Sequence, residues 1–451
     1  MIGLRADAVV TWEDGALTIV QNFGVHTARG LTPRIAALFG ELPGALADED
    51  ELAERLLLAG GTDQEVALLY LALGRLRPTF VHTVEYTGEP LLRIVPVARD
   101  AVFEVPELPA DHVVRLSRFA LVRQDAGELV LESPLARHKV VLSEKAMPLI
   151  AALSRGVRVG EAPEALCHLV AAGMARADDA EDTDPALRTW EFHNLYFHSR
   201  SRMGRHDGPI GGTYRFRGEL PPEPALKPLP EGPITELYRP SLTEAAAADP
   251  AFTTVLESRR SVRQYADAPV TARQLGELLY RAARVRGEIR PPTDGAPYES
   301  SNRPYPGGGA CYELELYLTV DRCEGLDQGV YYYDPYGHRL VTLPARAEDA
   351  RAMLTLAGMS TGGTAKPDVL ITMTSRFSRM SWKYAGLPYA ATLKNVGALY
   401  QTFYLVATAM GMAPCGLGNG DSDLAARAFG LDWAAESSVG EFLIGGAPAQ
   451  G

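Results

Sequence analysis

A proline-rich segment near the middle of the chain sets the strongest limit on its fold. Seven prolines fall between Pro221 and Pro240. Proline fixes the backbone φ angle and lacks an amide donor, so such a segment is stiff, extended and poor at forming a core. The sequence therefore predicts a separate folding unit on each side, with the C-terminal unit beginning near residue 250.

Length and charge narrow the class of protein. A chain of 451 residues has room for roughly two to four domains. The net charge of −12 argues against nucleic acid or an anionic membrane as a partner. The N-terminus lacks the apolar core of a signal peptide, and the most apolar run, about 389–413, contains Lys394, Asn395 and Gln401. We expect a cytoplasmic protein with a buried helix over this run.

The spacing of the cysteines indicates no disulfide or metal site that would constrain the fold. Four are present, and they show neither CxxC spacing nor any other metal-ligand spacing: Cys167, Cys311, Cys323 and Cys415. Isolated core thiols are the expectation, without a zinc site and without a disulfide framework.

Two similar patterns fill the first part of the chain. Residues 9–20 contain two β-rich runs around an Asp-Gly turn, and Thr32-Pro33 begins a series of helical patterns. Residues 119–131 repeat the hairpin before further helices. The order predicts two small winged-helix-like units, over residues 1–95 and 96–187, with chance similarity as the alternative. Their acidic character favours peptide binding at a hairpin edge over DNA binding.

Residues 188–249 are predicted to join the two halves. Aromatic residues between 190 and 197 indicate packing between domains, and the proline-rich segment follows them. As a less favoured alternative, three nearby arginines would contact the substrate: Arg200, Arg202 and Arg205.

Residues 257–265 concentrate positive charge in an acidic chain. A guanidinium presents a planar fork of donors that matches a phosphate, and a serine adds a hydroxyl. A solvated helix end followed by an edge strand is the alternative. The capping box Thr271-x-x-Gln274 then predicts an amphipathic helix over 271–285. The candidate phosphate ligands are Arg259, Arg260, Ser261 and Arg263.

A glycine-rich loop and an adjacent lysine and tyrosine are further candidates. Pro306, Gly307 and Gly308 allow the backbone to approach a flat ligand, although an ordinary loop before a strand would look alike. Lys383 and Tyr384 follow a buried strand. An ammonium close to a phenol lowers the pKa of the phenol and makes it a usable base. An exposed lysine beside a half-buried tyrosine is the alternative.

A long helix and two glycine-containing segments complete the pattern. Residues 389–411 predict a buried helix of about 23 residues, roughly 34 Å long, that ends at Gly411. Small residues around Gly397 suit close helix contact at a dimer seam. A predicted turn and a last core strand follow, the turn over Cys415, Gly416, Leu417 and Gly418 and the strand ending in Gly445 and Gly446.

Together these motifs resemble the SagB-type dehydrogenases, which form thiazoles and oxazoles in peptides. The Arg-Arg-Ser-x-Arg segment and its capping box resemble the entry of the wider nitroreductase fold. The Lys383-Tyr384 pair, the long helix and the region of Glu441 narrow the resemblance to the peptide enzymes. Gly307 stands where the family has a serine. The resemblance covers nearly the whole chain.

The resemblance implies an α+β fold and an FMN cofactor. Residues 250–451 would form a nitroreductase-like domain, with a central mixed or antiparallel sheet flanked by helices. The arginine segment would grip the FMN phosphate, and the loop at Pro306–Gly308 would reach the flavin from the partner subunit of a homodimer. The segment 415–418 would lie against the isoalloxazine, with Gly445 and Gly446 beside it.

The implied reaction is oxidation of peptide thiazolines and oxazolines to thiazoles and oxazoles in ribosomal peptide natural-product biosynthesis. Hydride would pass to the flavin while a base removes the neighbouring Cα proton, with Tyr384 as base and Lys383 tuning it, or the reverse. An azoline-containing precursor peptide and a cyclodehydratase are the implied partners. Two alternatives are an NAD(P)H-dependent nitro- or ene-reductase and a peptide-binding scaffold subunit with a vestigial flavin domain.

Overall fold

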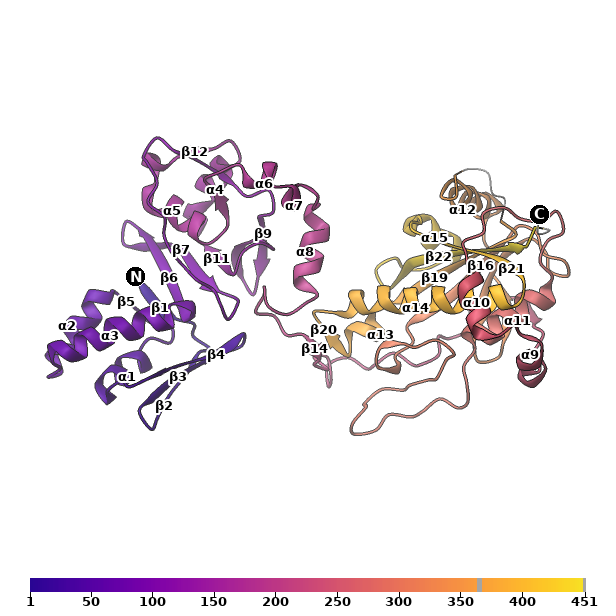
Figure 1. Cartoon of the computed structure of the whole chain (residues 1–451), viewed down its shortest axis with the longest axis horizontal. Coiled ribbons are helices and arrows are strands. Elements are labelled where there is room, and N and C mark those ends of the chain that lie inside the picture. Colours follow the sequence, from indigo (N-terminus) through magenta and orange to yellow (C-terminus); the bar gives the residue numbers. More distant parts are fainter. Residues whose placement is uncertain (363–366, 449–451) are drawn as a thin grey trace. The chain divides into compact units, whose positions relative to one another are not determined.

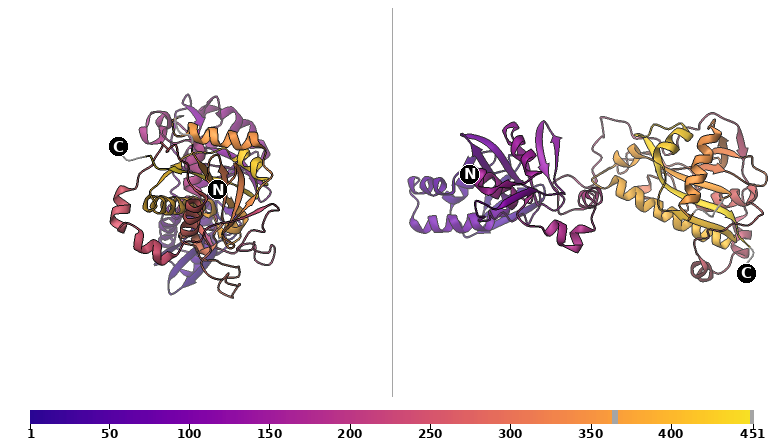
Figure 2. Two further views of the ribbon diagram at one scale, coloured as in Figure 1. Left: turned by 90° about the vertical axis from the view of Figure 1, so that its right-hand side faces the viewer. Right: turned by 90° about the horizontal axis from the view of Figure 1, so that it is seen from above.

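Two compact units make up the chain. The computed structural model describes residues 1–362 and 367–448 and divides the chain between Ile210 and Gly211 (Figure 1, Figure 2). The sequence predicted this division, but the second unit begins about forty residues before the expected position near 250, because part of the proline-rich segment packs on it.

The N-terminal unit contains thirteen strands among its described elements. They are β1 (Ile2–Leu4), β2 (Val9–Glu13), β3 (Ala16–Gln21), β4 (Gly24–Arg29), β5 (Leu46–Ala47), β6 (Phe80–Tyr86), β7 (Glu89–Pro96), β8 (Val113–Leu116), β9 (Leu121–Asp125), β10 (Glu128–Glu132), β11 (His138–Leu142), β12 (Val157–Arg158) and β13 (Ala175–Arg176). Its helices are α1 (Pro33–Gly40), α2 (Glu49–Leu58), α3 (Asp63–Leu76), α4 (Met147–Leu153), α5 (Pro163–Ala171), α6 (Ala180–Thr183), α7 (Pro185–Arg188) and α8 (Phe192–Arg200).

Both predicted hairpins of this unit are confirmed, but the predicted boundary at residue 95 does not divide it. A single antiparallel sheet runs in the order β5-β1-β6-β7-β11-β10-β9. Strand β7 ends at Pro96 and pairs along its length with β11, so the sheet crosses the boundary. The first hairpin, β2-β3, gains a third strand, β4, that the sequence analysis missed. The winged-helix description of each half stays a prediction.

The C-terminal unit is built on one large antiparallel sheet. Its strands are β14 (Gly211–Gly212), β15 (Ile234–Glu236), β16 (Leu314–Val320), β17 (Gly329–Asp334), β18 (Arg339–Thr342), β19 (Val369–Arg376), β20 (Tyr384–Ala385), β21 (Met412–Leu417) and β22 (Glu436–Gly446). Its helices are α9 (Leu242–Ala248), α10 (Phe252–Ser258), α11 (Ala272–Ala283), α12 (Ala347–Met359), α13 (Phe377–Ser381), α14 (Pro388–Ala409) and α15 (Ser422–Phe429).

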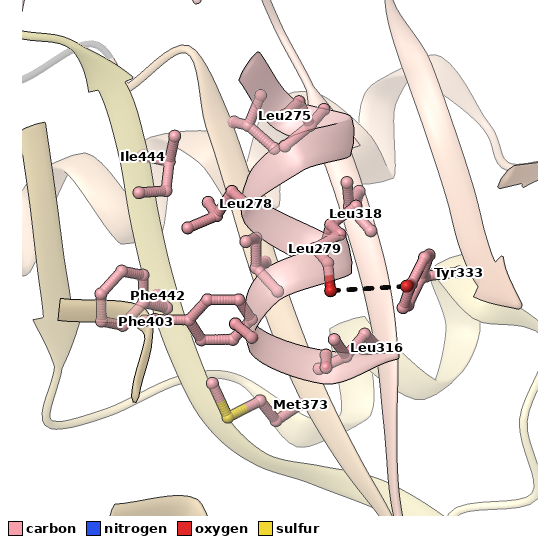
Figure 3. Close-up of a cluster of buried hydrophobic side chains, with 14 of the residues drawn as sticks. Leu275, Leu278, Leu279, Leu316, Leu318, Tyr333, Met373, Phe403, Phe442 and Ile444 are labelled. Carbon is pink, nitrogen blue, oxygen red and sulfur yellow. Dashed lines mark hydrogen bonds between the residues drawn. The ribbon is translucent and has the colours of Figure 1, made fainter. Parts of the chain in front are cut away.

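Helices cover both faces of that sheet, whose strand order is β15-β18-β17-β16-β19-β22-β21. Leu316 and Leu318 of β16 pack with α11 and α14, whereas Tyr317 packs with α12 and α15. Figure 3 shows the first of these cores, with Phe403 of α14 beside Phe442 of β22. The α+β fold with an antiparallel sheet between helices is as the resemblance implied.

The start of α11 and the burial of β16 are two local features of this unit. The capping box is formed as predicted, since the Thr271 hydroxyl accepts from the Gln274 amide and the Gln274 side chain accepts from the Thr271 amide. Strand β16 has no exposed face, because helices cover both sides of the sheet. Glu315 is therefore fully buried, and it forms an ion pair with Arg376 at 3.0 Å.

The proline-rich segment is not a free linker. Ala225 is completely buried, and Arg376 donates hydrogen bonds to the carbonyls of Pro224 and Ala225. The indole of Trp382 donates to the carbonyl of Leu220 at 2.8 Å. Prolines lack amide donors but keep their carbonyls, so the segment is held by donors from α13 and its neighbours.

The remaining expectations concern membranes and cysteines. Within the described residues, no helix combines the length and the apolarity that crossing a bilayer would require. All four cysteines are free, and Cys323 is the one that is not buried.

Candidate active site

The arginine segment follows the end of α10 and is docked onto β21. The amide of Val262 donates to the carbonyl of Pro414 at 2.8 Å. Beside it lies a cavity of about 820 Å³ that is lined by Arg259 and Arg260 together with Met412 and Pro414. We call the segment 259–263 with this cavity the arginine end of the site.

The guanidinium groups at the arginine end are unneutralised. Among the described residues, the guanidinium groups of Arg259, Arg260 and Arg263 form no ion pair and donate no hydrogen bond, although the Arg259 guanidinium lies 5.1 Å from the centre of the Tyr404 ring. Arginines of a folded protein usually find a carboxylate or carbonyl partner. Their convergence beside a cavity therefore leaves donors for an anion.

Two tyrosines of α14 organise this end, and the sequence analysis missed both. Tyr404 accepts a hydrogen bond from the Gly416 amide at 2.7 Å and contacts the Ser261 hydroxyl at 2.7 Å. Tyr400, one turn earlier, donates to the carbonyl of Leu417 at 3.2 Å and accepts from the Glu441 amide. The sequence signal that could have identified them is their four-residue spacing, which places both tyrosines on one face of the predicted helix.

The glycine-containing segments at this end differ from the expectation. Residues 415–417 are not a turn but the end of strand β21, paired with β22, and Gly418 follows the strand. Gly445 and Gly446 lie in or at the end of β22, where a Cβ on Gly445 would collide with the Tyr265 ring. Close packing on the neighbouring backbone explains these two glycines.

The lysine and tyrosine lie at a different place in the unit. Tyr384 begins the short strand β20, which pairs with β14, and the amide of Tyr214 donates to the Lys383 carbonyl at 3.1 Å. A Cβ on Gly309 would collide with both the Lys383 ammonium and the Tyr384 hydroxyl, so the two groups converge on that glycine. We call this place, with residues 307–309, the lysine end of the site.

Tyr298 is a third member of the lysine end that the sequence analysis missed. The Lys383 ammonium donates to the Tyr298 hydroxyl, which in turn donates to the carbonyl of Gly309 at 2.7 Å. Tyr298 lies in an irregular segment between α11 and β16, where no sequence spacing indicates a contact with Lys383. Its side chain is nearly fully buried, so it fixes the ammonium from the protein side.

The hydrogen bonding of Lys383 controls its charge. Burial acts to lower the pKa of Lys383, but the hydrogen bond to Tyr298 and the nearby Cys311 thiol outweigh it, and the pKa lies above its ordinary value. Burial raises the pKa of Tyr298 despite the opposing effect of the ammonium. Lys383 is therefore a cation at neutral pH, held by a neutral phenol.

The glycine-rich loop is held by α14. The Gly308 amide donates to the side-chain carbonyl of Asn395 at 3.1 Å, and the Asn395 amide donates to the buried carboxylate of Glu313 at 2.9 Å. A Cβ on Gly307 would come within 2.9 Å of the Tyr312 ring, which explains a glycine where a serine was expected. Pro306 precedes this loop and is exposed.

Helix α14 separates the two ends of the site within one chain. The lysine end lies before its first residue, Pro388, whereas Tyr404 of the arginine end lies about 24 Å further along the helix. Figure 1 shows β20 and α13 at one end of α14 and α10 and β21 at the other. One chain therefore does not bring the candidate phosphate ligands and the candidate catalytic pair together.

The arginines with the less favoured substrate role are occupied elsewhere. Arg200 donates to the Glu132 carboxylate at 2.6 Å and Arg205 donates to the carbonyl of Leu135 at 2.7 Å. The carbonyl of Arg202 contacts the ring of His206 at 2.9 Å. All these partners belong to the N-terminal unit.

The residues at the arginine end fit the FMN that the resemblance implies. Its guanidinium groups without carboxylate partners suit a phosphate, and the Ser261 hydroxyl lies 2.7 Å from the Tyr404 hydroxyl, whose ring the Arg259 guanidinium also approaches. The adjoining strand at 414–417 carries Gly416, where a Cβ would come within 3.2 Å of the Tyr400 ring, so the glycine allows α14 to pack closely on this strand. This donor set is suited to a dianionic group rather than to a metal, and no cluster of metal ligands was found among the described residues.

Two family models match this chain. The model of the nitroreductase family matches residues 256–445, and the model of the cyanobactin oxidase ThcOx matches residues 114–207. The first match contains both ends of the site. The second lies in the N-terminal unit, which a nitroreductase domain alone would lack.

Two known proteins are similar in sequence to parts of this chain. A Methanocaldococcus jannaschii protein, MJ1384, named as a nitroreductase, is 29% identical over 187 residues, 42% of this chain and 85% of that protein. The microcin B17-processing protein McbC of Escherichia coli is 30% identical over 117 residues, 25% of this chain and 43% of that protein.

Two solved structures are similar at low scores. A Ralstonia eutropha protein named as a nitroreductase has 23% identity and a TM-score of 0.38, covering 51% of this chain and 100% of that one. A chain of the E. coli microcin synthetase McbBCD complex with truncated pro-MccB17 has 19% identity and a TM-score of 0.35, covering 57% and 92%.

The matches confirm the resemblance seen in the sequence. The nitroreductase match covers the domain that holds the arginine and lysine ends, and FMN is the cofactor that this resemblance implies. The cyanobactin oxidase match adds the N-terminal unit. Residues 256–445 therefore match the nitroreductase family, and the matches together support a SagB- or McbC-type dehydrogenase of the nitroreductase fold.

Proposed function

We propose that this chain is an FMN-dependent dehydrogenase that oxidises thiazolines or oxazolines of a ribosomally made peptide to thiazoles or oxazoles. The observation that carries the proposal is the convergence of the Lys383 ammonium and the Tyr384 hydroxyl on Gly309. An azoline has an acidic Cα proton, and its removal needs a base beside a group that stabilises negative charge. The phenol and the ammonium supply these two properties.

The charge of Lys383 assigns the roles within the pair. Because its pKa is raised, the lysine carries a proton at neutral pH and is not a base there. Tyr384 is the group that takes the Cα proton, with Lys383 stabilising the phenolate that forms. FMN, when bound, supplies the acceptor for the two electrons that leave with the other hydrogen.

The working site is shared between two copies of the chain. Within one chain the Lys383–Tyr384 pair lies before the start of α14, whereas Tyr404 of the arginine end lies about 24 Å along it. Antiparallel packing of α14 on the α14 of a second copy would place the lysine end of one protomer beside the arginine end of its partner. An exposed stripe with four-residue spacing supports this packing: Tyr389, Leu393, Gly397 and Gln401.

The substrate and partner follow from the chemistry. An azoline forms when a cysteine, serine or threonine side chain attacks the preceding carbonyl and water is lost, so a cyclodehydratase must act first. The precursor peptide is then the shared substrate of both enzymes. The N-terminal unit, with the cyanobactin oxidase match, is the part of this chain suited to holding it.

The reaction is tested with purified yellow protein and a peptide that contains one azoline ring. We expect a mass loss of about two hydrogens per ring under air, with no change for the same peptide without a ring. Rapid bleaching of the flavin by NADH or NADPH without azoline oxidation would instead assign the chain to the nitro- or ene-reductases. A colourless protein that binds the peptide tightly would favour the scaffold role.

Whether two chains share one site is tested with a mixed dimer in which each chain carries a different defect. One chain carries Arg259→Ala and Arg263→Ala, the other carries Lys383→Ala and Tyr384→Phe, and differently tagged copies are co-expressed and purified as the mixed dimer. Such a dimer has one site with every defect and one with none, so about half of the wild-type rate is expected. A site within one chain predicts no recovery, because each chain is then defective.

A further inference from the structure

A second cavity lies on the opposite face of the sheet from α14. It has a volume of about 290 Å³ and is formed by α12, the end of β21, the start of α15 and β22. Its walls are largely apolar: Met353, Leu356, Ala357, Met359, Leu370, Leu417, Leu424 and Ala425. A cavity of this size with apolar walls and few polar groups is the usual form of a small-ligand site.

The charged groups of this cavity have one sign. Glu441 and Asp421 are the only ionisable residues that line it among those the structure describes. Asp421 caps α15 by accepting from the Leu424 amide at 2.9 Å, so one of its oxygens is occupied. Glu441 remains as the carboxyl available to a ligand.

The Glu441 carboxyl is buried without a cation. Its side chain is 8% exposed, it interacts with Ser438, and no arginine or lysine pairs with it among the described residues. Burial raises its pKa to about 6, so it is mostly ionised at pH 7.5. A buried carboxylate without a cationic partner is costly, and proteins usually pair it.

Gly420 keeps this carboxyl in place. A Cβ at that position would collide with both carboxylate oxygens of Glu441, so a side chain there would displace the carboxyl from the cavity. The glycine is therefore required by the position of the acid and not by a turn, because its φ angle is not in the left-handed region.

We infer that this cavity binds an alkyl chain that ends in a cation, and that the natural source is a lysine or arginine side chain of the peptide substrate. The apolar walls suit the methylene stem, and Glu441 suits the charged end. Leu417 of β21, an edge strand of the sheet, lines the cavity, while its neighbour Gly416 faces α14, so a side chain of a peptide whose ring lies at the flavin would enter the cavity around the end of this strand. This last step rests on the proposed function.

The cavity itself is tested on the FMN-loaded wild-type protein with three probes of one shape. Hexylamine, hexanol and hexanoate differ in charge and share the alkyl chain. By titration calorimetry at pH 7.5 we expect hexylamine to bind at least about tenfold more tightly than hexanol, and hexanoate not to bind. Equal affinity for hexylamine and hexanol would overturn the inference.

Two variants and one control locate the binding. Glu441→Gln keeps the shape of the side chain and should abolish the preference for hexylamine over hexanol, and Gly420→Ala should weaken hexylamine binding by displacing the carboxyl. Asp423→Asn removes an exposed charge from α15 outside the cavity and should change neither. An undiminished preference for hexylamine in Glu441→Gln would refute the assignment.

The pH dependence gives an independent reading of the same contact. The titratable groups near Glu441 are Asp421 at the cavity wall and Tyr400 on α14, and burial raises the pKa of Tyr400 well above its ordinary value. Hexylamine binding should therefore fall as the pH drops from 7.5 through about 6, the pKa to which burial raises Glu441. Constant affinity down to pH 5 would show that the ionised carboxyl is not the partner.

The source of the cation is tested with two azoline peptides that differ only beside the ring, one with lysine and one with norleucine. We expect kcat/KM to favour the lysine peptide by about tenfold, and Glu441→Gln to reduce the ratio to about one without slowing the norleucine peptide. Equal rates despite hexylamine binding would assign the cavity to a free amine and overturn the peptide source. If neither peptide is oxidised, the proposed function fails while the hexylamine titration still decides the cavity.

Discussion

The two ends of α14 differ in how far their polar groups are already paired. At the lysine end, Lys383 is bonded to Tyr298, the loop at Gly308 is bonded to Asn395, and β20 is paired with β14. At the arginine end, the backbone is docked on β21 but the guanidinium groups have no acidic partner among the described residues.

This difference indicates different tasks for the two ends. A set of groups fixed before substrate arrives is suited to proton transfer, because the geometry costs nothing at the moment of reaction. Cations left without partners are suited to a tightly bound anion that stays in place. We therefore propose the lysine end as the chemical half of the site and the arginine end as the cofactor half.

The largest effect should come from the chemical half. Tyr384→Phe removes the base and should lower kcat for azoline oxidation by about 10²–10⁴-fold, with Lys383→Ala close behind. FMN content, measured by absorption, should stay as in the wild type, because neither side chain contacts the arginine end of its own chain.

Lys394→Ala is the matched control for the lysine. It removes an exposed ammonium from α14 outside the pair, and normal turnover is expected. Normal turnover of both Lys383→Ala and Tyr384→Phe would remove the assignment of the chemical half.

The next effect should come from the cofactor half. The double substitution Arg259→Ala with Arg263→Ala removes two phosphate donors and should weaken FMN binding by about 100-fold, as read by fluorescence titration of the apoprotein. Arg351→Ala, an exposed arginine of α12, serves as the control and should bind FMN normally. Unchanged affinity in the double variant would contradict the comparison, since the free guanidinium groups would then serve another purpose.

The sequence was informative where periodicity or a motif is local. The helix of residues 389–411, the capping box at Thr271 and both N-terminal hairpins were predicted from spacing and turn residues, and each is present. Local patterns of this kind depend on backbone geometry that neighbouring residues determine.

Contacts between distant segments were not accessible in the same way. Tyr298 and Asn395 reach the lysine end from positions 85 residues before Lys383 and 12 residues after it, and no spacing rule connects them. The continuous sheet across residue 95 was missed because strand pairing is decided by tertiary packing. The separation of the two ends was missed because adjacent motifs in a family pattern say nothing about which protomer supplies them.

A smaller effect, on the pH profile, should show whether Tyr298 acts on Lys383 through its hydrogen bond or only through packing. Tyr298→Phe keeps the ring but removes the hydrogen bond that raises the pKa of Lys383, so this pKa should fall. Because a raised lysine pKa keeps the charged form to higher pH, the alkaline limb of the kcat/KM profile should move to lower pH, with a loss of about tenfold at the optimum.

Tyr214→Phe is the matched control for this measurement. Its ring lies 6.4 Å from that of Tyr298 in the same aromatic cluster, but its hydroxyl is not bonded to Lys383. We expect an unshifted pH profile. A shift of equal size in both variants would mean that Tyr298 only packs, and the lysine end would be less fixed than the comparison requires.

The smallest expected effect on FMN binding comes from the Ser261 hydroxyl, which is already hydrogen-bonded to Tyr404. The Gly416 amide donates to the Tyr404 oxygen, so the Tyr404 proton is directed to the Ser261 oxygen, and the Ser261 proton remains for a phosphate. Ser261→Ala should therefore weaken FMN binding by about fivefold, the value of one neutral hydrogen bond, whereas Thr355→Ala within α12 should not. Tyr404→Phe should give a similar loss, because the serine is then free to turn its proton away. If Tyr404→Phe binds FMN normally while Ser261→Ala does not, the serine is positioned by the backbone alone, and the arginine end depends less on α14 than its contacts indicate.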